Sequence, residues 1–192
     1  SCIAPFTAME GTLLEDEAYH EFPEKIQGDS FGMNDFFVGR DKYLWLDKEV
    51  VMPPAKEGYE LVGLFNFGKT YGGYTKGFES LLYVNGSPFQ GVDTNHNEVL
   101  FEGMEEKKVR LTFLLWTGLE GGGEHQTFYH QLKQAEFVYL HKKTDELYYF
   151  AKAITETILL LPDEDERKEA LKGALERALL CIDWDEDAFF AS

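Results

Sequence analysis

The spacing of apolar residues changes near His141, and this change constrains the fold more than any other feature. In Lys108–Trp116, apolar and polar residues alternate, which is the period of a strand with one buried face. Beyond residue 141, apolar residues recur every three or four positions, as in an amphipathic helix. Several strands followed by helices predict a mainly β chain: an antiparallel β-sandwich or jelly roll with a C-terminal pair of α-helices.

The clearest turn signal lies at Asn85-Gly86. It follows the apolar run at residues 81–84, and Asn-Gly accepts the positive φ angles that a type I′ hairpin requires. In residues 1–30 the short apolar pieces contain prolines, so we expect only edge pieces and loops there, with a turn at residues 28–32. The other expected strands are Tyr43–Val51, residues 61–67, residues 98–101, and one or two strands within residues 127–141.

Two helices are expected after the strands, each with one buried stripe. Pro162 ends the first, and Asp163 is expected to cap the second, with Glu166 completing a capping box. We therefore divide the chain into a β-sandwich accessory domain, residues 1–141, and a helical extension, residues 142–192. The stripes consist of Leu147, Phe150, Ala151, Ile154, Ile158 and Leu161, and of Leu171, Ala174, Leu175, Ala178 and Leu179.

The charge balance disfavours some classes of partner. The chain of 192 residues has a formal net charge of −17, which repels phosphate backbones and anionic lipid surfaces, so we expect neither nucleic acid nor membrane as a partner. Neutral ligands such as sugars carry no such penalty. Cys2 and Cys181 form no disulfide framework, no leader or membrane-spanning run is evident, and a cytoplasmic location is expected. The start at Ser1, without Met, suggests a trimmed chain.

Residues 63–70 match the phosphate-binding pattern G-x-x-x-x-G-K-[ST]. That chemistry needs a pliable loop whose backbone N–H groups surround phosphate at the start of a helix. Here Leu64, Phe65 and Phe67 alternate as in a strand, and no strand ending in Asp follows to hold magnesium. A strand running into a glycine-rich loop is the favoured interpretation.

Residues 28–32 match the nucleophile elbow G-x-S-x-G and are similar to the start of the GDSL esterases. An elbow requires a buried strand before Ser30, a helix after it and a histidine base. Residues 24–27 make a poor buried strand, and no Asp-x-x-His follows near the C-terminus. A turn with local hydrogen bonds is favoured over a serine esterase.

Other site-forming residues give weaker signals. The five histidines, His20, His96, His125, His130 and His141, lack zinc-ligand spacing, so solvated or core positions are expected. A pair of glycosidase-like carboxylates depends on separation in space, which the sequence does not give. Loop aromatics are candidates for carbohydrate contact because such rings stack on neutral sugar faces, although packing is the more common role of each: Tyr71, Tyr74 and Trp116.

Three stretches in order resemble the N-terminal domain of the cytosolic and bacterial type of α-mannosidase, family 38 of the glycoside hydrolases. They are residues 28–32 ahead of an aromatic strand, the hairpin at residues 79–91, and Gln134–His141 passing directly into a helix. The resemblance implies a jelly roll similar to galactose-binding domains, followed by helices that lead into a zinc-dependent catalytic domain.

That catalytic domain would begin with a His-x-Asp motif. This chain contains none, so no catalytic or metal residue is carried over, and no cofactor is expected in it; zinc would belong to the absent catalytic domain. The resemblance thus implies a non-catalytic accessory domain that braces its own catalytic domain in an enzyme acting on mannose-containing glycans. It also implies subunit contacts in a homo-oligomer.

The chain's acidic C-terminal part also carries apolar residues, which we expect to meet a partner surface. They are the candidates for the domain interface: Ile182, Trp184, Phe189 and Phe190. The alternative is a free-standing carbohydrate-binding module, which predicts sugar affinity in the isolated chain but leaves the two helices unexplained.

Overall fold

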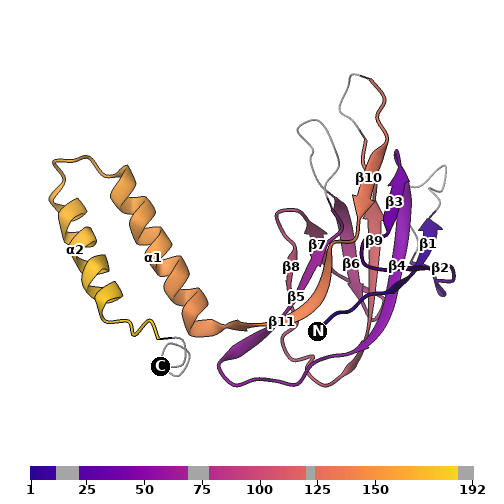
Figure 1. The fold of residues 1–192 in the computed structure, drawn as a ribbon, viewed down its shortest axis with the longest axis horizontal. Helices are drawn as coiled ribbons and strands as arrows, with labels where there is room; N and C mark the ends of the chain where they lie inside the picture. The colour runs from indigo at the N-terminus through magenta and orange to yellow at the C-terminus, as the bar shows by residue number, and fades with distance from the viewer. Residues whose placement is uncertain (12–21, 69–77, 120–123, 186–192) are drawn as a thin grey trace. The chain divides into compact units, whose positions relative to one another are not determined.

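The computed structural model describes residues 1–11, 22–68, 78–119 and 124–185 (Figure 1). The chain divides into two compact units, which we describe separately. The β unit comprises residues 1–56 and 60–139, and the helical unit comprises residues 57–59 together with the chain from Leu140 onward.

The β unit is built around a sheet of six strands in the order β2-β1-β4-β9-β6-β7, in which all neighbours are antiparallel. At its centre, β4 and β9 pair over their full length, from Tyr43 opposite Trp116 to Val51 opposite Lys108. The strands are β1 (Phe6–Gly11), β2 (Asp29–Phe31), β4 (Tyr43–Val51), β6 (Glu79–Val84), β7 (Ser87–Asp93) and β9 (Lys108–Trp116).

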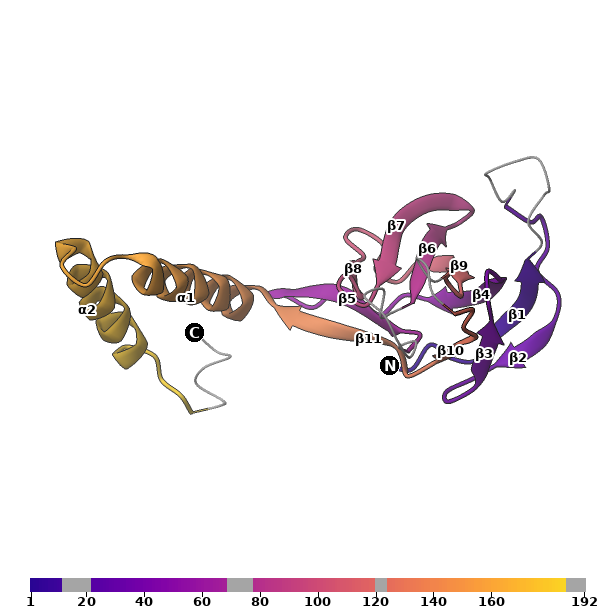
Figure 2. The ribbon, with the colours of Figure 1, turned by 90° about the horizontal axis from the view of Figure 1, so that it is seen from above.

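Two smaller sheets complete the β unit. One pairs β3 (Phe36–Gly39) with β10 (Phe128–Gln131), and the other has the order β11-β5-β8. The backbone N–H of Lys133 donates to the carbonyl of Asn66 at 2.8 Å, which ties the link between β10 and β11 to the end of β5. Both views place β11 beside β5 (Figures 1 and 2). The bounds are β5 (Tyr59–Asn66), β8 (Glu98–Leu100) and β11 (Gln134–His141).

The hairpin between β6 and β7 has the turn that its sequence predicts. Asn85 and Gly86 both have positive φ angles, 51° and 83°, as a type I′ turn requires. The side chain of Asn85 also accepts a hydrogen bond from the backbone N–H of Arg110 at 2.9 Å, so the turn is attached to the neighbouring strand β9.

One hydrophobic core joins all three sheets. Phe113 of β9 lies at its centre and is fully buried, with its ring centroid 4.7 Å from that of Phe65, 5.1 Å from Phe67 and 5.9 Å from Phe6. The core also takes Phe37 from β3 and residues from the β11-β5-β8 sheet. These features confirm a mainly β chain with antiparallel sheets, consistent with a β-sandwich, and with two C-terminal helices. The jelly-roll topology stays a prediction.

A second apolar cluster covers part of the outer face of the large sheet. Ile26 packs there with Trp45 and Tyr83, and Phe22 contacts both of those rings at 5.7 and 5.0 Å between centroids. Phe22 and Ile26 belong to the chain just before β2, so this short segment acts as a cover that the strand pattern did not predict.

The expectation for residues 1–30 is wrong in two places. β1 is not an edge piece, because it lies between β2 and β4. Pro5 directly precedes this strand, so its missing N–H costs no ladder hydrogen bond. Residues 29–31 are not a turn but form β2, with Ser30 paired to Thr7. β3, within residues 33–40, was not predicted at all.

The helical unit contains α1 (Lys142–Leu160) and α2 (Glu166–Leu180). The cap of α2 is Asp165 rather than Asp163: its carboxylate accepts from the backbone N–H of Arg167 at 2.9 Å. Asp163 instead accepts from Lys168 Nζ at 2.6 Å. The expectation that each helix has a buried stripe is also wrong, because neither helix has a buried residue. Neither helix in the described ranges is long and apolar enough to cross a membrane.

Candidate functional site

A row of polar and aromatic side chains crosses the outer face of the large sheet at one end of its strands. The pairing register places Tyr43 beside Trp116, Trp116 beside Glu79, and Glu79 beside Asp93. Tyr43 and Glu79 begin their strands, whereas Trp116 and Asp93 end theirs, so the row lies at the rim of the sheet. We call these four residues, together with Asp41 in the turn before β4, the rim site.

Trp116 is held in a fixed orientation within the rim site. Its indole Nε1 donates to Asp41 Oδ1 at 2.9 Å. Asp41 has a φ angle of 51° and donates its backbone N–H to the carbonyl of Gly118 at 3.0 Å, so its own position is fixed. The rings of Tyr43 and Trp116 lie 6.3 Å apart at an interplanar angle of 23°. Both side chains are partly exposed, which leaves aromatic surface at the rim.

Two carboxylates lie near these rings. Partial burial raises the pKa of Tyr43, and the negative charges of Asp41 and Glu79 raise it further, so both carboxylates act on its hydroxyl group. Glu79 is exposed, and no described residue donates a hydrogen bond to its carboxylate or forms an ion pair with it. The rim site therefore combines aromatic rings with acceptors that are available to a ligand.

Asp93 forms a compact local motif with the loop that follows it. Its Oδ1 accepts from the backbone N–H groups of Asn95 at 2.6 Å and His96 at 2.9 Å, and its Oδ2 lies 3.1 Å from His96 Nδ1. Partial burial raises the pKa of Asp93, but these hydrogen bonds outweigh it and keep the pKa below its usual value. The motif orders the loop between β7 and β8 beside the rim site.

The rim site does not fit a metal or a nucleophilic mechanism. Among residues 1–11, 22–68, 78–119 and 124–185, no group of three or more His, Cys, Asp and Glu side chains could hold a metal ion. The pair of Asp93 and His96 is thus a two-residue motif, and no serine or cysteine among the described residues is hydrogen-bonded to this imidazole.

The helical unit presents a different kind of surface. α1 has its partly buried apolar residues, among them Leu147, Ile154 and Ile158, on one side, and several large apolar side chains are exposed elsewhere on it beside charged residues. Phe150 is 68% exposed and Leu160 is 85% exposed. We call the exposed set the apolar helical surface: Tyr148, Tyr149, Phe150, Leu159, Leu160, Leu180 and Trp184.

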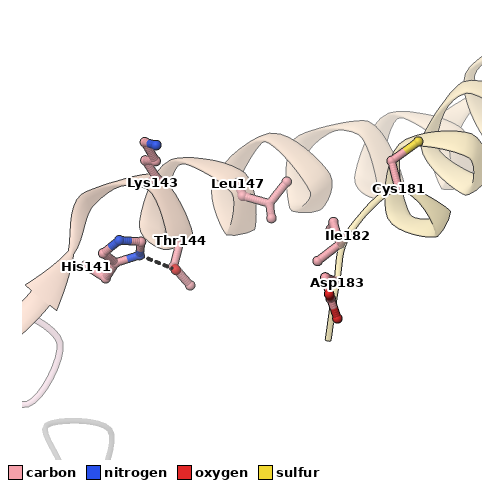
Figure 3. A pocket seen from close by; sticks show the side chains of 7 residues that line it. All are labelled: His141, Lys143, Thr144, Leu147, Cys181, Ile182 and Asp183. Carbon is pink, nitrogen blue, oxygen red and sulfur yellow. Dashed lines mark hydrogen bonds between the residues drawn. The ribbon is translucent and has the colours of Figure 1, made fainter. Parts of the chain in front are cut away.

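An open pocket of about 270 Å³ lies where the start of α1 meets the end of α2 (Figure 3). His141 Nδ1 is 2.6 Å from Thr144 Oγ1, and the Tyr59 ring lies 4.9 Å from the His141 ring. In Figure 3, Cys181 lies at the opposite end of the pocket from His141, so thiol and imidazole form no nucleophile and base pair. The lining residues are His141, Lys143, Thr144, Leu147, Cys181, Ile182 and Asp183.

The structure places the predicted carbohydrate and interface residues as follows. Trp116 ends a strand of the sheet rather than lying in a loop. Ile182 is partly buried in the pocket wall, and Trp184 is 67% exposed. The remaining candidates lie outside the described residues: Tyr71, Tyr74, Phe189 and Phe190.

Neither sequence motif has the structural context that its chemistry requires. Gly63 lies inside strand β5, where a Cβ atom would come 2.6 Å from the Phe65 ring, so the core explains this glycine. Lys69 and Thr70 lie outside the described residues. Ser30 is exposed in β2. The segment before it, with Phe22 and Ile26, covers the outer face of the sheet and is not a buried strand.

Of the five rim-site residues, the sequence indicated only Trp116, and Asp41, Tyr43, Glu79 and Asp93 were missed. A signal was present, because Tyr43 and Trp116 stand at opposite ends of two clearly predicted strands and become neighbours in an antiparallel pair. No comparable signal in the sequence indicated that β6 lies next to β9. No protein-family model and no curated protein sequence matches this chain.

Proposed function

We propose that this chain is a non-catalytic accessory β-sandwich of a zinc-dependent α-mannosidase, which braces the catalytic domain and its subunit contacts. The apolar helical surface is the observation that carries this proposal. Seven large apolar side chains are exposed in the described part of the helical unit, and exposed apolar surface often marks an interface. The exposed tyrosine, phenylalanine and leucine side chains of α1 would be removed from water by a protein surface that covers them.

The proposed partner is the chain's own catalytic domain, with a homo-oligomer as a further expectation. Zinc and the hydrolysis of α-mannosides in mannose-containing glycans belong to that domain, since this chain supplies no His-x-Asp motif. The two free cysteines, Cys2 and Cys181, fit a reducing cytoplasm.

The full reading frame that encodes this chain provides the test. We expect its product to hydrolyse an aryl α-mannoside, to lose that activity with a chelator and to regain it with zinc. In the full product, Phe150→Glu should lower the melting temperature, because it places a charge in an apolar interface. In the 192-residue chain alone, the same substitution should leave the melting temperature unchanged.

Phe36→Glu is the matched control, because Phe36 is a similarly exposed aromatic residue, 60% accessible, on the β unit. Phe150→Glu should destabilise the full product more than Phe36→Glu does. A full product without zinc-dependent mannosidase activity, or one that tolerates Phe150→Glu, contradicts the proposal.

A free-standing carbohydrate-binding module is the second candidate function. The specific observation in its favour is the ring pair of Tyr43 and Trp116 beside two carboxylates. It predicts sugar binding by the isolated chain and no requirement for a partner. Calorimetric titration with mannose oligosaccharides, together with the oligomeric state of the isolated chain, separates it from the bracing role.

A further inference from the structure

The geometry points to the rim site as a binding site for one unit of a neutral sugar. In this arrangement the pyranose ring lies against Trp116 and Tyr43, and its hydroxyl groups donate to Asp41 and Glu79. The inference goes beyond the bracing role and does not depend on it. It would supply the location of binding if the carbohydrate-binding alternative were correct.

The two rings provide the apolar part of the site. They are stacked cross-strand neighbours at 6.3 Å between centroids and both stay partly exposed, so the sheet itself rather than a loop presents aromatic surface. The hydrogen bond from Trp116 Nε1 to Asp41 fixes the indole, so little side-chain freedom is lost when a ligand binds.

The carboxylates provide the polar part. The Oδ1 atom of Asp41 accepts the hydrogen bond from the Trp116 indole, and no described residue donates a hydrogen bond to its Oδ2 atom. Glu79 has no hydrogen-bond donor within the described ranges either. Both lie next to Trp116, Asp41 through the indole hydrogen bond and Glu79 as a cross-strand neighbour. A hydroxyl-rich ligand supplies the donors that these acceptors lack, and hydrogen bonds to ionised acceptors are the stronger kind.

The charges at the rim decide against other ligand classes. Asp41, Glu79 and Asp93 are all acidic, and none of the five rim-site residues is basic, so an acidic sugar or a phosphate would be repelled. A divalent cation lacks a set of three ligands among the described residues. A neutral polyhydroxylated ring satisfies both the aromatic surface and the acceptors.

Another exposed aromatic region of the β unit lacks this combination. Phe36 and Tyr129 lie on the β3-β10 sheet, where their exposed neighbours are Val38 and Met33. The residues paired across this sheet include Phe36 with Gln131 and Val38 with Tyr129, and none of them is acidic. This surface serves as the internal control, because it offers exposed rings without the arrangement of acceptors.

The test is calorimetric titration of the 192-residue chain with mannotriose, maltotriose and cellotriose as neutral probes and with glucuronate as the acidic probe. We expect at least one neutral probe to bind at millimolar concentration or below and glucuronate not to bind. Trp116→Ala and the double variant Asp41→Asn with Glu79→Gln should each weaken binding about tenfold or more, the loss expected from a stacked ring or a charged hydrogen bond. Phe36→Ala should leave the affinity unchanged.

The amide double variant keeps the shapes of both side chains, so it decides the question even if Trp116→Ala unfolds. Failure of all three neutral probes to bind overturns the proposal, as does equal binding of glucuronate or unchanged affinity in the double variant. None of these results bears on the bracing role, which is measured through Phe150 in the full reading-frame product.

Discussion

The β unit and the helical unit place their apolar side chains in opposite ways. Among the described residues, every buried apolar side chain belongs to the β unit, whereas neither helix buries a single residue. Phe113 and Phe150 illustrate the difference. Phe113 has no exposed surface and contacts three other phenylalanine rings, whereas Phe150 is 68% exposed.

This difference shows what a hydrophobic pattern does and does not determine. In the β unit, alternating residues from three sheets meet in one core, so the pattern is satisfied within the chain. In the helical unit, α1 and α2 contact each other, but several large apolar residues of α1, and Leu180 of α2, stay exposed. The excess of apolar surface is the physical reason to expect a partner.

The largest expected difference is between two phenylalanine-to-alanine substitutions, one in each unit. Phe113→Ala removes a fully buried ring and should lower the free energy of unfolding of the β unit by about 3–5 kcal/mol. Phe150→Ala removes a mostly exposed ring and should change it by less than about 0.5 kcal/mol. Urea unfolding followed by tryptophan fluorescence, which reports the buried Trp45, measures both.

Equal losses from the two substitutions would break the comparison. They would mean that Phe150 is buried in solution, for example in an oligomer of the isolated chain. Light scattering at several protein concentrations distinguishes that outcome, because only an oligomer depends on concentration.

Gly28→Ala tests the cover segment of the β unit. A Cβ atom at Gly28 would lie 1.9 Å from the carbonyl oxygen of Ala8, so the backbone of the segment has to move away from β1. We expect a loss of about 1–3 kcal/mol in the free energy of unfolding. Gly91→Ala is the control, because nothing lies within 4 Å of a Cβ atom there. A loss as large at Gly91 would show that glycine flexibility, not packing, is responsible.

His130 gives the β unit a pH dependence. Its imidazole is fully buried, with Nε2 2.9 Å from the carbonyl of Thr117 and Nδ1 without a hydrogen-bond partner in the described structure. Burial lowers the pKa of His130 below 6.5, so the unfolded chain takes up the proton more readily than the folded one. Stability should therefore be complete above pH 6.5 and decline as the pH falls below that value.

His130→Gln should reduce this decline, because glutamine takes up no proton between pH 7 and pH 5. The free energy of unfolding from urea titrations between pH 7 and pH 5 provides the measurement. The same decline in wild-type protein and in His130→Gln would contradict the assignment to His130.

The sequence predicts those parts of the fold that follow from local pattern. β4 and β9 have the predicted bounds, and the hairpin at Asn85-Gly86 forms, because alternation and turn chemistry depend on nearby residues. β1, β2 and β3 were missed. They are short or follow a proline, and long-range pairing partners rather than local propensity make them strands.

The candidate site was less predictable than the fold. Trp116 was predicted as a loop aromatic and instead ends a strand, partly exposed, and its partners Asp41 and Glu79 reach it only through a turn with positive φ and through the pairing of β6 with β9. Burial in the helices was overestimated for a related reason. A helical stripe shows which side is apolar, but what covers that side depends on surfaces beyond the helix.

The cap of α2 gives the smallest effect and separates the two units by pH. Asp165→Ala should reduce helix content, measured by far-UV circular dichroism, more than Asp163→Ala does, since only Asp165 accepts from a backbone N–H of the first turn.

The side chain and backbone of Arg167 lower the pKa of Asp165 to about 2, compared with 3.8 ordinarily. Because the folded pKa is the lower one, the contribution of the cap persists above pH 3.8 and is lost only as the pH falls toward 2. On acidification the β unit should thus weaken first, below pH 6.5, while the cap of α2 remains. A loss of helix content between pH 6.5 and pH 5 that matches the loss of tryptophan signal would show instead that the two units unfold together.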